Sequence, residues 1–234
     1  MDGVLDRARR AGVTRIVVPA YDRASWEAVA GLARRDGVRA AYGLHPWAAA
    51  EDLEPDRLVD ALRNGDAVAV GELGLDFAID AFDRERQLRV LRPQLETAAA
   101  LDLPVLLHCR SAFEELLALL REFAPGLRGV VHAFSRGPDL ARRFLDLGFH
   151  LGFGGAITRP NAVRARRSAV AAPWDRIVLE TDAPSIGLDG IEAAHVEPRH
   201  VLDVARSLAE LRGEPLETVA RRTTENARAL FRIP

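Results

Sequence analysis

Residues 67–76 read Ala-Val-Ala-Val-Gly-Glu-Leu-Gly-Leu-Asp, an apolar run that reaches its first charged residue at Glu72. The run lacks the polar and apolar alternation of a strand with one solvent-facing side, so we predict a strand buried on both faces. Six further runs have the same character. The predicted strands are Val13–Val18, Val38–Gly43, Ala67–Glu72, Pro104–His108, Gly129–His132, Phe149–Phe153 and Arg176–Thr181.

Longer stretches with helical periodicity separate these runs. Trp26, Val29, Ala30 and Ala33 follow the i, i+3, i+4, i+7 spacing that gathers apolar side chains on one helix face, and residues 88–98, 113–120 and 201–208 do the same. Strands that alternate with helices indicate right-handed βαβ units in a parallel sheet. Since no glycine-rich dinucleotide fingerprint follows the first run, we predict an α/β fold of the (β/α)8 TIM-type barrel class, with residues 1–234 forming one domain.

A closed barrel of this type has about eight strands, one more than the predicted runs supply. Residues Gly3–Ala11 have a helical pattern that leads directly into Val13–Val18. We therefore expect the first β-strand to be missing, so that the chain starts within a βα connection. Unpaired strand edges at this gap would favour self-association.

The composition excludes several kinds of chemistry. All 32 Lys+Arg residues are arginine, which rules out Schiff-base catalysis and the Walker-A lysine. A formal net charge of -2 gives no general attraction to nucleic acid or to anionic membranes, so a polyanionic substrate would need a local site. The one cysteine, Cys109, cannot form an internal disulfide, and no signal peptide or membrane span is recognisable, so we expect a cytoplasmic protein without membrane partners.

Four polar residues stand where apolar runs end: Glu72, His108, His132 and Asp182. In a barrel, the carboxyl ends of all strands meet at one rim, where active sites of this fold are built. Each residue alone also fits a structural role, as a hydrogen-bonded core histidine or a helix N-cap. Two imidazoles and two carboxylates at equivalent positions together predict a divalent metal site.

Three more residues near this rim have two interpretations each. His45, in Gly-Leu-His-Pro, either faces the site or stabilises a turn before proline. Arg110 either offers a bidentate donor to a phosphate or forms an ion pair with Glu114. Asp76 either orients the rim or caps the helix that follows.

Six motifs in order along the chain resemble the TatD family of metal-dependent deoxyribonucleases. Each motif is modest alone, but the ordered set is specific and covers essentially the whole sequence. The motifs are Gly43-Leu44-His45-Pro46, Gly71-Glu72-Leu73-Gly74-Leu75-Asp76, Pro104-Val105-Leu106-Leu107-His108-Cys109-Arg110, His132-Ala133-Phe134-Ser135, Glu180-Thr181-Asp182-Ala183-Pro184 and Thr224-Glu225-Asn226-Ala227-Arg228-Ala229-Leu230-Phe231.

The resemblance implies a barrel with one or two divalent ions, zinc, magnesium or manganese, that hydrolyses phosphodiester bonds of DNA, usually at a 3′ end. It implies that Glu72 is the bridging carboxylate, that His108 and His132 bind one metal, and that Asp182 contacts the other and handles the attacking water. This gives Asp182 and Glu72 catalytic roles. His45, Arg110 and Ser135 match positions near the scissile phosphate.

One family motif is absent from the sequence. Members of this family normally open with a strand carrying His-x-His, and nothing before Asp2 supplies it. We therefore expect one metal site, formed by Glu72, His108 and His132, to persist and the second to be weakened or lost. The alternatives to a deoxyribonuclease are a related metal hydrolase acting on a small amide or ester, and a non-catalytic barrel that binds nucleic-acid ends or a protein.

Overall fold

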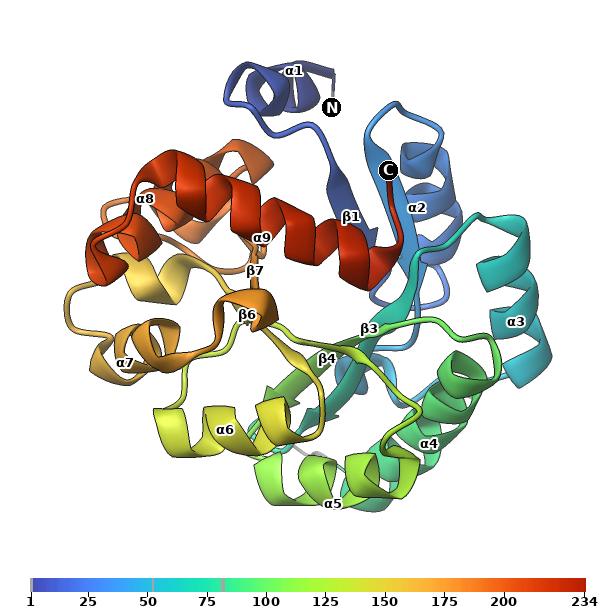
Figure 1. The fold of residues 1–234 in the computed structure, drawn as a ribbon. Coiled ribbons are helices and arrows are strands. Elements are labelled where there is room, and N and C mark those ends of the chain that lie inside the picture. Colours follow the sequence, from blue (N-terminus) through green and yellow to red (C-terminus); the bar gives the residue numbers. More distant parts are fainter. Residues whose placement is uncertain (1, 52, 81–82) are drawn as a thin grey trace. The chain divides into compact units, whose positions relative to one another are not determined.

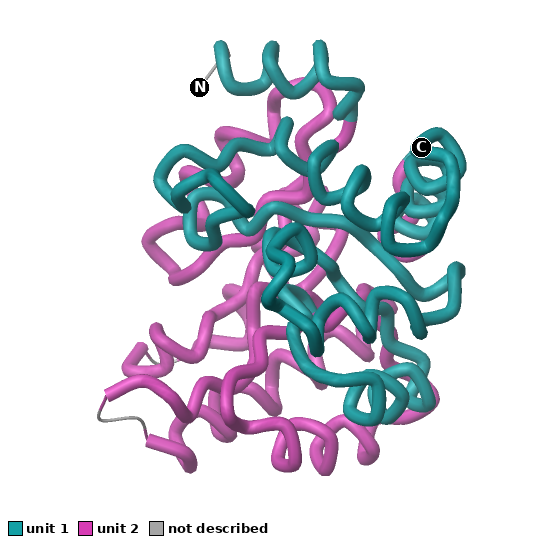
Figure 2. Tube along the Cα trace, turned by 90° about the vertical axis from the view of Figure 1, so that its left-hand side faces the viewer, with its two compact units in different colours: residues 1–14, 132–229, 234 teal, residues 15–131, 230–233 magenta. Residues whose placement is uncertain are grey.

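The structure, a computed structural model, describes residues 2–51, 53–80 and 83–234. In these ranges, seven strands alternate with helices along the chain (Figure 1). The chain forms two compact units, coloured separately in Figure 2. Unit 1 comprises residues 1–14, 132–229 and 234, and unit 2 comprises residues 15–131 and 230–233. The prediction of a single domain over residues 1–234 stays a prediction, and each unit is described by itself.

Unit 2 contains the first five strands, which pair in parallel in their order along the chain. A helix follows each of the first four strands before the next begins. The elements are β1 (Ile16–Pro19), α2 (Ser25–Ala33), β2 (Val38–Tyr42), the short 3-10 helix η1 (Pro46–Ala48), α3 (Pro55–Asn64), β3 (Ala69–Asp76), α4 (Arg84–Ala100), β4 (Val105–Arg110), α5 (Phe113–Phe123) and β5 (Gly129–Val131).

Unit 1 contains the last two strands, which also pair in parallel. Among the described residues, no helix has both the length and the apolar character that a membrane crossing requires. The elements of unit 1 are α1 (Asp2–Arg10), α6 (Pro138–Asp146), β6 (His150–Phe153), η2 (Gly155–Thr158), α7 (Val163–Ala171), η3 (Trp174–Arg176), β7 (Ile177–Leu179), η4 (Ala193–His195), η5 (Pro198–His200), α8 (Val201–Arg212) and most of α9 (Leu216–Phe231).

Each of the seven predicted runs overlaps a strand, and the predicted helix at residues 3–11 is α1. The α/β class with parallel strands is therefore confirmed. The predicted ends of two strands were too early: β3 runs on to Asp76 and β4 to Arg110, so Glu72 and His108 lie inside strands, not at their ends. The pairing of β3 with β4 shifts register between Val70 and Leu73 and then continues to Asp76 and Arg110. The two strands therefore extend together past Glu72 and His108.

Strand β3 is buried on both faces, as its sequence predicts, because every residue except Glu72 is buried. Strand β1 differs from this prediction, since its residues are half-buried or exposed. Helix α4 contributes the buried side-chain amides of Gln87 and Gln94, which are seven residues apart and therefore lie on one face of the helix. Gln94 accepts the N–H of Leu44 at 2.7 Å and donates to the carbonyl of Leu44 at 3.2 Å. Gln87 exchanges the same pair of hydrogen bonds with Asp76, both at 2.8 Å. α4 thereby fixes the backbone immediately before His45 and at the end of β3.

Gly74 allows β3 and β4 to approach closely at the point where His108 stands. Its φ of 147° is a conformation that other residues rarely adopt. A Cβ at this position would also overlap the backbone carbonyl oxygen of His108. Glycine is therefore required here by both conformation and space.

We predict that Gly74→Ala lowers the free energy of unfolding by about 3 kcal/mol, because the added methyl must displace a buried strand. Urea denaturation measures the change. Gly31→Ala in α2 is the matched control, since no atom lies within 4 Å of its Cβ position, and it should shift stability by less than about 1 kcal/mol. Equal stabilities of the two variants would contradict the assigned role of Gly74.

Candidate metal centre

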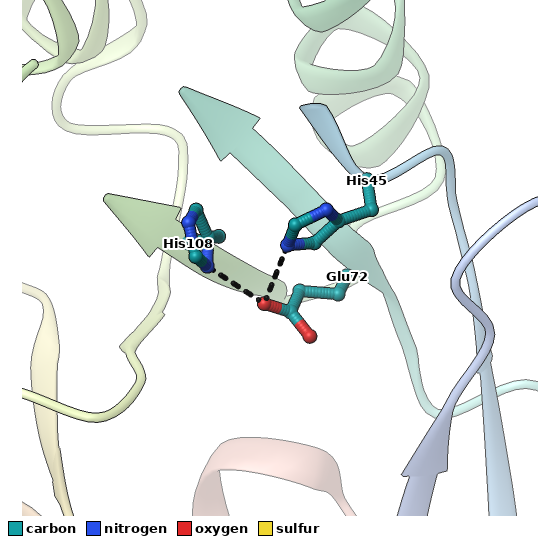
Figure 3. A group of neighbouring side chains, drawn as sticks. All are labelled: His45, Glu72 and His108. Atoms are coloured by element: carbon teal, nitrogen blue, oxygen red, sulfur yellow. Dashed lines mark hydrogen bonds and ion pairs between the residues drawn. The ribbon is translucent and has the colours of Figure 1, made fainter. Parts of the chain in front are cut away.

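Three side chains of unit 2 meet around one carboxylate oxygen. Glu72 Oε1 lies 3.1 Å from His108 Nδ1 and 3.3 Å from His45 Nε2. Figure 3 shows both rings directed at this oxygen, His108 from β4 and His45 from the segment after β2. All three side chains are largely shielded from solvent, with 16% of Glu72, 15% of His108 and 6% of His45 exposed. The predicted association of Glu72 with His108 is present, and His45 joins it.

The spacing of these atoms suits a divalent ion. One ligand atom from each residue lies within 4.8 Å of the other two. Atoms bound tetrahedrally to one zinc ion at about 2.0–2.2 Å lie about 3.3–3.6 Å from one another. Imidazole nitrogen and carboxylate oxygen are ligands that zinc and similar ions accept. Glu72 and His108 therefore offer donors that fit a metal, with the further ligands left to other residues or water.

The hydrogen bonds of His108 indicate which nitrogen would bind the metal. His108 Nε2 lies 3.2 Å from Asp76 Oδ2, on the side of the ring away from the Nδ1 contact with Glu72. An ionised carboxylate can only accept, so each of these two contacts suits a ring proton. With a metal ion bound to Nδ1 beside Glu72, the ring proton would lie on Nε2, where Asp76 accepts it. A carboxylate behind a histidine ligand is the arrangement that orients such rings in metal sites.

Asp76 is fully buried and is held by several N–H groups. Its Oδ2 also accepts the indole N–H of Trp47 at 2.7 Å, and its Oδ1 accepts the N–H of Ala78 at 2.9 Å. Burial raises the pKa of Asp76, but the hydrogen bonds from Trp47 and Ala78, together with His108, outweigh it and hold the pKa below the ordinary value. Asp76 is therefore an anion at neutral pH. It orients the site and does not cap α4, whose N-cap is Asp83.

In His45 the nitrogen that faces Glu72 is Nε2, and the contact made by the other nitrogen leaves the proton on it. Its Nδ1 accepts the backbone N–H of Trp47 at 3.2 Å, which caps the 3-10 helix η1. In the neutral ring the proton then lies on Nε2, which faces Glu72 Oε1. His45 thus serves the turn and the site together, so both of its interpretations from sequence hold. In this state it is a hydrogen-bond donor rather than a metal ligand.

Arg110 lies two residues beyond His108 and hence on the same side of β4. Its Nη1 lies 3.9 Å from Asp76 Oδ2, and 56% of the side chain is exposed. At this distance the ion pair is loose, and the remaining N–H groups of a guanidinium are suited to a phosphate. The geometry is compatible with the substrate-binding role that the sequence predicts.

In unit 1, Glu180 organises the surroundings of His132. Its Oε1 accepts the N–H of Ala133 at 2.7 Å and lies 3.7 Å from His132 Nδ1. A Cβ added to Gly152 would come within 2.7 Å of Glu180 Oε2, so this glycine makes room for the carboxylate. Glu180 directly follows β7, whereas Asp182 stands three residues beyond that strand.

A cavity of about 560 Å³ in unit 1 includes Ser135 and Asp182 in its wall. Glu180 and Arg159 line it as well, and Arg159 Nη2 donates to the carbonyl of Gly187 at 2.6 Å. The cavity therefore combines carboxylates with one guanidinium. Two of the residues predicted from sequence, Ser135 and Asp182, share this space.

Three residues in loops after strands have positive φ although they are not glycine: Ser111 at 56°, Ala133 at 47° and Asp182 at 51°. Such backbone conformations cost about 1–3 kcal/mol each and gather at functional sites. Ser111 follows β4, and Ala133 and Asp182 belong to motifs of the predicted site. Asp66, Asp102 and Arg232 have positive φ outside these motifs, so the conformation by itself does not single out the site.

The four predicted metal ligands divide between the units. Glu72 and His108 lie together in unit 2, whereas His132 and Asp182 belong to unit 1. Four contributors were not predicted as site residues: Trp47, Glu180, Gln87 and Gln94. Glu180 had a signal, since it ends an apolar run as Glu72 does in the predicted strands, but nothing in the sequence singles out the others.

The whole chain resembles proteins already known. The sequence model of the family described as TatD-related DNase matches residues 1–232. YjjV of Escherichia coli (strain K12), described as an uncharacterized metal-dependent hydrolase, is 38% identical over 235 residues, which cover 98% of this chain and 91% of YjjV. The 3′-5′ ssDNA/RNA exonuclease TatD of Erwinia billingiae (strain Eb661) is 33% identical over 246 residues, which cover 100% of this chain and 93% of that protein.

The crystal structure of Escherichia coli YjjV, a TatD homologue, matches with a TM-score of 0.91 and 36% identity. The match covers 100% of this chain and 92% of that chain. It confirms the fold class and the family resemblance that the sequence predicts.

We predict that Asp76→Asn weakens zinc or manganese binding about 10- to 100-fold, measured by isothermal titration calorimetry. In the unaltered protein three N–H groups point at the carboxylate of Asp76, whereas the amide of asparagine has one acceptor oxygen and no charge. Asp83→Asn is the control, because asparagine also caps helices and Asp83 lies at the start of α4. If both variants bind metal like the unaltered protein, Asp76 does not support His108.

Proposed function

The chain belongs to the family of TatD-related DNases and is a metal-dependent hydrolase, and on that premise we propose that it hydrolyses phosphodiester bonds of DNA at the 3′ end of single strands. The observation that carries the proposal is the His45–Glu72–His108 cluster with Asp76 behind His108. The description of the Erwinia billingiae relative as a 3′-5′ ssDNA/RNA exonuclease supports the choice of substrate.

Glu72 and His108 would hold a divalent ion, His108 through Nδ1. Such an ion supplies an activated water near neutral pH and offsets the charge that grows on phosphoryl oxygens. The family resemblance adds His132 and Asp182 as ligands, and these roles remain part of the proposal. Glu72 has two carboxylate oxygens, which allows it to serve a second ion if one is present.

The other residues provide binding and proton transfer. Arg110 presents an exposed guanidinium, which is a donor to the oxygens of a phosphate. The family resemblance adds His45 near the scissile phosphate, with its Nε2 beside Glu72. Ser135 supplies a hydroxyl in the wall of the unit 1 cavity. Asp182, in the same wall, is proposed to accept the proton of the attacking water.

We predict metal-dependent release of nucleotides from a 3′-labelled single-stranded oligonucleotide, lost with EDTA and restored by Mg²⁺, Mn²⁺ or Zn²⁺. Asp182→Asn should lower kcat by about 10²- to 10⁴-fold, the usual contribution of a general base. His108→Ala should lose both bound metal and activity. Quench-flow or gel assays give the rates, and elemental analysis gives the metal content.

A panel of small amide and ester substrates separates this function from a related hydrolase activity. Turnover of an amide or carboxylic ester without release from DNA would contradict the proposal. Stoichiometric metal without turnover of any substrate would instead support a binding protein.

A further inference from the structure

Two aromatic side chains stand out on the surface of unit 2. Among the described residues, Tyr21 and Trp47 are the aromatic side chains that are exposed, at 42% and 51%. The other described aromatic side chains are buried or half-buried, which removes much of their apolar area from water. Two exposed rings in contact with each other therefore need a reason other than folding.

Both rings adjoin the metal cluster. Tyr21 stacks on His45, with ring centroids 5.2 Å apart and planes 25° from parallel. The Trp47 ring lies 5.0 Å from His45 and 6.4 Å from His108, and its centroid is 6.2 Å from Tyr21. A ligand lying on these rings would thus reach the residues that we propose to contact the scissile phosphate.

The rings are held in place before any ligand arrives. Trp47 donates its indole N–H to Asp76 at 2.7 Å and its backbone N–H to His45. The backbone N–H of Tyr21 donates to Ser25 Oγ at 3.0 Å, and its carbonyl accepts the N–H of His45 at 2.9 Å. A surface that is already ordered loses little conformational entropy on binding.

The charges beside Tyr21 do not suit a phosphate. Asp22 and Glu51 both act on its phenol, whose pKa is raised by burial and then by these two carboxylates. Glu51 accepts the backbone N–H of Arg23 at 3.3 Å, and the guanidinium of Arg23 is paired with Glu54 at 3.0 Å. The surface therefore offers a neutral phenol and an indole among carboxylates, which favours an uncharged planar group.

We propose that Tyr21 and Trp47 form a stacking platform for a nucleobase of the strand whose phosphate is cleaved. This inference rests on the proposed nuclease function and adds how the strand is recognised. Aromatic stacking tolerates all four bases because each has a π face, and it requires a base that is not stacked within a duplex. The platform thus selects unpaired nucleotides without reading their sequence.

The test uses the full chain with Mg²⁺ and a short single-stranded oligonucleotide whose terminal linkages are non-hydrolysable phosphorothioates. Tyr21→Leu, which removes the π face, should weaken binding about 10-fold, and Tyr21→Phe, which keeps it, should stay within about 2-fold. An otherwise identical strand with abasic residues at its 3′ end should bind the unaltered protein and Tyr21→Leu equally. Fluorescence anisotropy measures all of these affinities.

Two further readouts distinguish stacking from a structural role of Tyr21. Base stacking should quench tryptophan fluorescence in the unaltered protein, and Trp47→Phe should abolish that quenching. Tyr21→Leu should leave the dependence of affinity on salt unchanged, whereas Arg110→Ala should reduce its slope, because only the latter loses a phosphate contact.

Equal affinities of the base-containing and abasic strands for the unaltered protein would overturn the platform while leaving the nuclease function intact. The same conclusion follows if Tyr21→Leu binds both strands like the unaltered protein. If the unaltered protein neither binds nor cleaves either strand, the proposed function itself fails, and the platform fails with it.

Discussion

The buried carboxylate of Asp76 is the constraint on which the site in unit 2 depends. A charge without exposure to water is tolerated only when hydrogen bonds and opposite charges replace its hydration. Here the N–H groups of Trp47, Ala78 and His108 surround it. Each donor is thereby fixed in turn, so that one desolvated anion orients both the His108 ring and an exposed indole.

The scaffold delivers this carboxylate to the right place through ordinary backbone chemistry. Gln87 of α4 satisfies both backbone groups of Asp76, and Gln94 does the same for Leu44, the residue before His45. Gly74 brings β3 against the backbone of His108. The pairing of the parallel strands β3 and β4 therefore sets where Glu72 and His108 lie along the sheet. Helix α4 fixes the backbone before His45 and at the end of β3. The proposed hydrolytic site and the proposed stacking platform depend on the same set of contacts.

The sequence predicts most of this fold because most of its strands are apolar runs and its helices are amphipathic, two patterns that are local. Glu72 and His108 were identifiable for the same reason, since a polar residue is conspicuous in an apolar run. Asp76 had two equal interpretations, and only the tertiary contact with His108 separates them. The extension of β3 and β4 involves pairing between the two strands, and the roles of Gln87 and Trp47 depend on partners far away in the chain. Local periodicity carries no information about such pairings.

The proton positions of His108 and His45 in the zinc-bound protein can be measured by nitrogen-15 NMR of the imidazole rings. With Zn²⁺ bound we predict protonation of Nε2 in both rings, with Asp76 beside that nitrogen in His108 and Glu72 beside it in His45. Addition of Zn²⁺ should shift the His108 Nδ1 resonance to that of a bound nitrogen and leave His45 Nε2 protonated. A proton on His108 Nδ1, or zinc bound through its Nε2, would contradict the account.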